Sequence, residues 1–235
     1  MTFSWKRVSA IFIKDYKDFS RNMAVSIVIF MPLLLAAFYG RMGVQSIDTF
    51  FMLFNLSFTM VATFVQCCLI AEEKEKNTLR GLMLSPASTL EILSGKSLLS
   101  FLSTALVIIF SAFLAEYHPA NIGIIGIALL LSSFFYIGLG TLLGLFAKSV
   151  MEASVYILPV MLLFSFGSSI TSLADRYPVL EAANYLPNIQ LIEIATKVEA
   201  GAQFSDVLLP LGWILLWGIV VFIATFLLYR KRMVD

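Results

Sequence analysis

Residues 49–71 read TFFMLFNLSFTMVATFVQCCLIA, and residues 72–79 continue as EEKEKNTL. The first stretch has no charged residue, and about 20 apolar residues in a helix are enough to cross a bilayer core about 30 Å thick. The second stretch is a dense run of charges. The abrupt change predicts a membrane-spanning helix that ends at a water-exposed loop.

The composition of the whole chain points the same way. Of its 235 residues, 60% are hydrophobic and 13% are charged, whereas a soluble domain has about 45–50% apolar and about 25% charged residues. This excludes an ordinary soluble enzyme. The net charge of +1 lacks the basic excess of a nucleic-acid-binding protein. Cys67 and Cys68 are adjacent, so they indicate packing residues rather than a disulfide framework or a spaced metal site.

Charge-free stretches of similar length recur along the chain. They predict an all-α integral membrane fold in which the whole chain, 1–235, forms a single transmembrane domain with six transmembrane helices. The predicted spans are 22–40, 49–71, 97–115, 122–147, 153–174 and 207–229.

The basic residues fix the expected orientation. Of sixteen Lys and Arg residues, all but Arg41, Arg176 and Lys197 fall on one side of the predicted spans. Because positive charge near spans stays in the cytoplasm, we expect a multi-pass protein of the cell membrane with both termini cytoplasmic.

The stretch before the first span, 4–21, has an apolar stripe at helical spacing, and its basic residues fall on the opposite side. This pattern is typical of a helix that lies in the membrane interface. Such a helix is either a simple anchor or a lever that a partner could move. The stripe consists of Trp5, Val8, Phe12, Tyr16 and Phe19.

The predicted cytoplasmic loop 72–96 contains signals for a short helix. Pro86 after Ser85 suits a first helical position, and Ser88 with Glu91 suits a capping box. We expect Gly95 to end this helix before the third span. A short capped helix here suits docking to a soluble partner, although a plain connecting helix fits the same signals.

The predicted outer segment, 175–206, is too long for a tight turn. Pro187 can start a helix through Val198, and Pro178–Tyr185 can form a shorter one. We expect both to lie in the outer interface or to dip into the membrane.

No catalytic constellation is visible in the sequence. Gly95-Lys96-Ser97 imitates the end of a phosphate-binding loop, but position 90 is Leu90 where that motif needs glycine. His118 is the only histidine, which argues against a histidine-rich metal site. No ionisable residue falls near the middle of a predicted span, which argues against a proton-driven carrier.

Polar residues in the second span share one helical face. Asn55, Thr59, Thr63 and Gln66 follow at intervals of 4, 4 and 3, so they either bond between helices or line a substrate path. Gly140 and Gly144 have the spacing that allows two membrane helices to pack closely.

Several motifs occur in a fixed order. Residues 73–79 read EKEKNTL, and Leu84-Ser85-Pro86, Gly95-Lys96, Leu186-Pro187 and Gly201 follow. Together they resemble the membrane subunit of ABC transporters of the type-2 exporter family, with its Glu-x-Glu-x-Gly-Thr-Leu, Ser-Pro and Gly-Lys pattern. Asn77 stands where that family usually has glycine, and because asparagine tolerates the left-handed region, we expect the turn to be kept.

The resemblance implies an amphipathic elbow helix before six spans, a coupling helix in the first cytoplasmic loop and re-entrant helices before the last span. It implies two separate ABC ATPase subunits, which bind ATP and Mg²⁺, and a second permease copy or a paralogous permease. This chain would itself hold no cofactor. The residues implied to contact the ATPase are Glu73, Glu75, Ser85, Pro86, Ser88, Leu90 and Glu91.

The function predicted on this basis is ATP-driven export. The cargo would be amphipathic or apolar, such as a peptide, an antibiotic or a lipid-linked compound, moved out of the cytoplasm or the inner leaflet. The alternative is a channel or facilitator that works without ATP.

Overall fold

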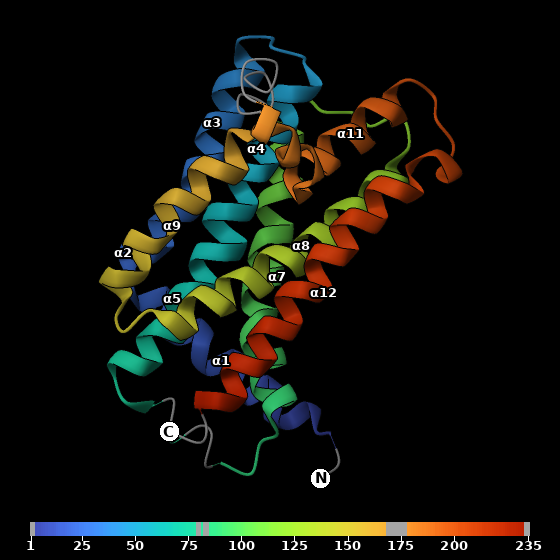
Figure 1. Ribbon diagram of the computed structural model, residues 1–235. Helices are drawn as coiled ribbons and strands as arrows, with labels where there is room; N and C mark the ends of the chain where they lie inside the picture. Colours follow the sequence, from blue (N-terminus) through green and yellow to red (C-terminus); the bar gives the residue numbers. More distant parts are fainter. Residues whose placement is uncertain (1–2, 79–80, 82–84, 168–177, 233–235) are drawn as a thin grey trace.

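The computed structural model describes residues 3–78, 81, 85–167 and 178–232 (Figure 1). Within these ranges the fold is all helical and has no strand, as predicted. The elements are α1 (Trp5–Arg21), α2 (Met23–Ser26), η1 (Ile27–Ile29), α3 (Phe30–Arg41), α4 (Ile47–Ser57), η2 (Phe58–Thr63), α5 (Phe64–Glu75), α7 (Thr89–Leu114), α8 (Ile122–Phe146), α9 (Val150–Ser165), η3 (Pro178–Tyr185), α11 (Pro187–Glu199), η4 (Phe204–Val207) and α12 (Leu208–Arg232).

Among the described residues, 4 helices are long and apolar enough to cross a membrane: Ile47–Glu75, Leu90–Leu114, Ile122–Phe146 and Phe204–Leu228. Two predicted spans, 22–40 and 153–174, overlap the shorter apolar helices Ile27–Arg41 and Val150–Ser165. Part of the latter prediction falls in 168–177, outside the described residues. The count of six spans therefore stays a prediction.

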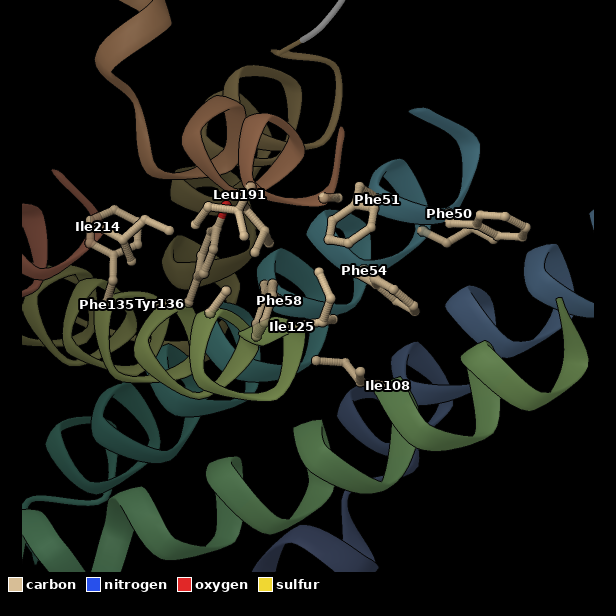
Figure 2. Packing of buried hydrophobic residues seen from close by; sticks show 14 of the residues in the cluster. Phe50, Phe51, Phe54, Phe58, Ile108, Ile125, Phe135, Tyr136, Leu191 and Ile214 are labelled. Atoms are coloured by element: carbon tan, nitrogen blue, oxygen red, sulfur yellow. The ribbon is translucent and has the colours of Figure 1, made fainter. Parts of the chain in front are cut away.

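The continuous helix formed by α4, η2 and α5 is the centre of the molecule. In the most apolar stretch of this helix 94% of residues are buried, whereas in the most apolar stretch of Phe204–Leu228, which includes most of α12, 28% are buried. Its aromatic residues build the core shown in Figure 2, where Phe58 stacks on Tyr136 of α8 at a ring-centroid distance of 4.9 Å. A helix enclosed on every side can bury polar groups on any face, provided its neighbours supply partners.

The turn in the middle of this central helix is a π-helix, η2, which the sequence pattern does not predict. A π-helical turn widens the helix and redirects the residues that follow. The hydroxyl of Thr59 donates to the carbonyls of Asn55 and Leu56 at 3.1 and 3.0 Å, so a local side chain satisfies backbone groups at the wide turn.

The paired glycines of α8 allow it to lie directly on the central helix, as their spacing predicts. A Cβ on Gly140 would collide with the carbonyl oxygen of Thr63, and one on Gly144 would lie 2.8 Å from the carbonyl oxygen of Cys67. Thr63 and Cys67 are themselves one turn apart, so two successive turns of each helix touch.

Helix α7 differs from the prediction. Its N-cap is Ser88, and the expected capping box with Glu91 is present. The helix does not end at Gly95, however, but continues to Leu114. Gly95 lies inside this helix where α1 crosses it. A Cβ at this position would lie 2.8 Å from the Cβ of Ile11, so the absence of a side chain allows α1 to pack closely.

Helix α11 begins at Pro187, as predicted, with proline in its first turn. The Asn188 amide donates to the carbonyls of Leu163 and Phe164 at 3.3 and 3.0 Å. These carbonyls belong to the end of α9, so α11 packs into one end of the bundle (Figure 1).

Candidate functional site

Helix α1 packs across the beginning of α7 at the opposite end of the molecule from α11 (Figure 1). Its buried residues are Val8, Ile11 and Asp15. The predicted stripe is turned partly outward, since Trp5 is 74% and Tyr16 55% exposed. The other two aromatic residues of the stripe, Phe12 and Phe19, are half-buried against the bundle.

A buried ion cluster joins α1, α5 and α7. We define it as Lys14, Asp15, Glu73 and Lys96, of which the last three are buried and the Lys14 side chain is 44% exposed. The Lys96 ammonium lies 3.2 Å from Asp15 Oδ2 and 2.9 Å from Glu73 Oε1, and its side chain is 0% exposed. Lys14 also pairs with Glu73 and lies 3.3 Å from Asp15. Two carboxylates from different helices thus hold one fully buried cation.

The electrostatics of the cluster follow from burial and from these pairs. Burial raises the pKa of Asp15, although Lys96 and Lys14 oppose the rise. For Lys14, burial would lower the pKa, but the Glu73 and Asp15 carboxylates together raise it. An unpaired buried charge is costly, so removing one member would strand the charges that remain.

A second contact, the cap pair of Arg7 and Glu91, ties α1 to the first turn of α7. Arg7 donates two hydrogen bonds to the Glu91 carboxylate, at 2.7 and 2.9 Å. This hydrogen bonding raises the pKa of Arg7. Glu91 also accepts from the backbone N–H groups of Ser4 and Ser88, at 2.6 and 2.7 Å. One carboxylate therefore caps the starts of both helices.

The charge run at the end of α5 connects further elements. After Glu73, Lys74 donates to the carbonyl of Leu145 at 2.7 Å and to that of Ala147, at the end of α8. Glu75 accepts from the N–H of Val150 at 3.0 Å, at the start of α9. Such contacts satisfy backbone groups that helix ends leave unpaired. Consecutive residues thus link the central helix to α1, α7, α8 and α9.

The predicted partner-contact residues fall into two groups. Pro86 and Leu90 are exposed, and Leu90 is 56% accessible. Glu75 is exposed too. Ser85 and Ser88 are half-buried. Glu73 and Glu91 are buried and face α1, so a direct contact of these two with another protein is not available in this arrangement.

The turn after α5 keeps the predicted left-handed residue. Asn77 has φ 56°, a conformation that glycine adopts freely and that asparagine tolerates better than most residues.

The polar face of the central helix is buried and bonded to its neighbours. Thr59 shares a hydrogen bond with Ser165 at 3.0 Å, and Thr63 donates to the carbonyl of Tyr136 at 3.0 Å. Asn55 and Gln66 reach α8, α11 and α7 through their amides. All four residues thus make hydrogen bonds between elements inside one chain.

Sequence reasoning missed the groups that hold α1 in place, namely Asp15, Lys14, Arg7 and Lys96. A signal for Asp15 was present, because it follows Val8 and Ile11 at intervals of 3 and 4, on the face that α1 buries. A carboxylate on a buried face needs a cation, and Lys96 lies near the start of α7.

Comparison with known proteins adds one match. The family model described as ABC-2 family transporter protein matches residues 18–227. No curated protein matches the chain. The matched region covers the described apolar helices and the charge run at the end of α5. The chain therefore belongs to the ABC-2 transporter family and is a multi-pass membrane protein.

Proposed function

We propose that this chain is the permease subunit of an ATP-driven exporter in the cell membrane. It spans the membrane six times, with both termini in the cytoplasm, and pairs with a second permease. Two separate ATPase subunits bind and hydrolyse ATP with Mg²⁺. Membership of the ABC-2 family supports the permease role and association with an ABC ATPase.

The observation that carries the coupling proposal is the connection of α7 to its neighbours. Pro86 and Leu90 expose apolar surface at the start of α7, where an ATPase subunit would dock. The cap pair and the buried ion cluster bind α1 to this end of α7. A displacement of the α7 start by the ATPase therefore moves α1 with it, because separating them would leave charges buried and unpaired.

In this proposal α1 is the elbow helix and the first turn of α7 is the coupling helix. Glu73 and Glu91 act inside the chain by holding α1, while Pro86 and Leu90 make the contact. Glu75 and Lys74 pass the movement to α9 and α8.

The proposed cargo is amphipathic or apolar, such as a peptide, an antibiotic or a lipid-linked compound. The support is the placement of charge: the ionisable residues of the described long helices lie near their ends, at Asp48 and at 72–75 in the central helix. A path for a lone ion is usually marked by ionisable groups at mid-membrane. The polar face from Asn55 to Gln66 remains our proposed path if the helices separate during transport.

The docking contact can be tested with Leu90→Asp in a chain co-expressed with its ABC ATPase partner. The expected result is loss of copurification, because a carboxylate replaces an apolar contact. Phe204→Asp is the matched control, since Phe204 is 48% exposed at the other end of the molecule. Unchanged copurification of Leu90→Asp would contradict the docking site. Transport by the purified chain in liposomes without an ATPase would instead support the facilitator alternative.

A further inference from the structure

A groove opens on the surface between α7 and α12, with α8 as its floor. Its cavity volume is about 360 Å³, within the range of small-molecule sites, which are about 300–1,000 Å³. The residues that shape it are Leu98, Phe101, Ile137, Gly138, Phe222 and Thr225. A Cβ at Gly138 would lie 3.0 Å from Val221 of α12, so this glycine lets α12 pack closely on the floor, and the aromatic rings form the sides.

The groove lies within the membrane-spanning region. All three of its helices are long and apolar enough to cross a membrane. It runs beside the first turns of α7, which also carry the cap pair, and beside Thr225 in the last third of α12. It therefore faces the leaflet next to the buried ion cluster. By the topology proposed above, this is the cytoplasmic leaflet.

The size of the groove decides what can fill it. A helix with side chains is about 10 Å across, so 360 Å³ would hold roughly one turn of it or less. A whole helix therefore does not fit inside the groove, whereas a single extended hydrocarbon chain does. An empty apolar groove would forfeit dispersion contacts along its whole lining, and water would find few partners there.

Two hydroxyl groups lie in the otherwise largely apolar lining of the groove. Ser94 and Ser97 lie three residues apart on α7 and both line the groove, so their side chains share one side of the helix. No hydrogen bond joins either hydroxyl to another residue in the part of the chain that the structure describes. Both are free to donate to an ester carbonyl of a lipid.

We propose that this groove binds one acyl chain of a glycerophospholipid from the leaflet beside the ion cluster. The chain lies along Ile137 and Gly138 between the aromatic sides, and the ester group accepts hydrogen bonds from Ser94 and Ser97. Leu90, the proposed ATPase contact, also lines the groove, but neither Ser97 nor Phe222 belongs to that contact, so lipid binding stands or fails separately from the proposed export function.

The occupant can be identified by photocrosslinking from the groove. The whole chain is produced with Phe222→p-benzoylphenylalanine, purified in a maltoside detergent and irradiated, and its intact mass is measured. The expected product is heavier by one phospholipid. The control places the same group at Phe113, which is 78% exposed on α7 and does not line the groove, and is expected to retain no phospholipid adduct. A crosslink between two chains, or an adduct of detergent alone, overturns the proposal.

A second variant tests the site without crosslinking. Ser97→Leu fills the groove and removes one donor, so phospholipid retained per chain in native mass spectrometry is expected to fall about tenfold, the equivalent of about 1.4 kcal/mol. Leu106→Phe, also on α7 and outside the groove, is expected to retain lipid like the unaltered chain. Equal retention by both variants overturns the proposal.

Discussion

At the scale of single residues, Lys96 has the most demanding environment among the described side chains. It is fully buried, and its ammonium is shared by carboxylates from α1 and α5. An ion pair of this kind adds little net stability when complete, but losing one partner is expensive because the other charge is stranded. The cluster thus acts as a latch, by which we mean that it holds α1, α5 and α7 in one specific arrangement.

Replacing Lys96 by methionine is expected to lower the free energy of unfolding by about 3–5 kcal/mol. The reason is that Asp15 and Glu73 lose their buried partner, and Lys14 alone must balance both. Unfolding in mixed micelles provides the measurement. Lys148→Met is the control, because Lys148 is exposed; equal losses in the two variants would refute the latch.

The raised pKa of Lys14 makes a prediction for alkaline stability. A cation whose pKa is raised on folding stabilises the fold fully below its ordinary value of 10.5, and this contribution is lost as the pH rises through the folded-state pKa. The free energy of unfolding should therefore fall as the pH rises above 10.5 and through the folded-state pKa of Lys14. In Lys14→Arg the fall should shift to higher pH, because arginine stays charged to above about 12. Thermal melting against pH measures both, and coincident curves would contradict the role of Lys14.

At the scale of helices, close packing of α8 on the central helix depends on glycine. The sequence spacing of Gly140 and Gly144 indicates a close contact, and the structure supplies the partner, the turns at Thr63 and Cys67. The partner could not be predicted, because any helix with small residues or exposed carbonyls offers a similar surface.

Gly140→Ala is expected to destabilise the fold by about 1–3 kcal/mol, since the added methyl group overpacks against the carbonyl of Thr63. Gly126→Ala lies on the same helix with nothing within 4 Å of the added Cβ. It should be neutral or stabilising by up to about 1 kcal/mol. Unfolding of the two variants under identical conditions makes the comparison, and a tolerated Gly140→Ala would show that the helices can separate freely.

Local sequence signals predicted where several helices begin. Nonlocal contacts explain why the end of one helix and the π-helical turn were not predicted. Ser88 caps α7 and Pro187 starts α11, because capping and a fixed φ act over a few residues. Gly95 was expected to end a helix, yet α7 continues because α1 packs against the space that the missing side chain leaves. The π-helical turn η2 was also invisible, since it depends on the neighbours of the central helix.

At the scale of the whole molecule, composition and charge placement predicted the all-α membrane class, and the family match bears it out. The site was predicted only in part. The motif from Glu73 to Leu79 marks the right region, but a sequence motif does not say that Glu73 turns inward to Lys96 while Leu90 remains exposed. That difference arises from the packing of α1, whose partners lie about eighty residues away in the chain.

The central claim is that α1 and the start of α7 move together when ATP drives the permease, and the cap pair offers the most direct measurement. ATP turnover is compared in nanodiscs for complexes of the ATPase with the unaltered chain, Arg7→Gln, Glu91→Gln and the double variant. Glutamine at position 91 keeps the capping box. Each single change should lower turnover, and the double variant should fall no further than Glu91→Gln, because Glu91→Gln already breaks the pair and also removes the acceptor for the Ser4 N–H. Unchanged turnover, or losses that simply add, would contradict the claim.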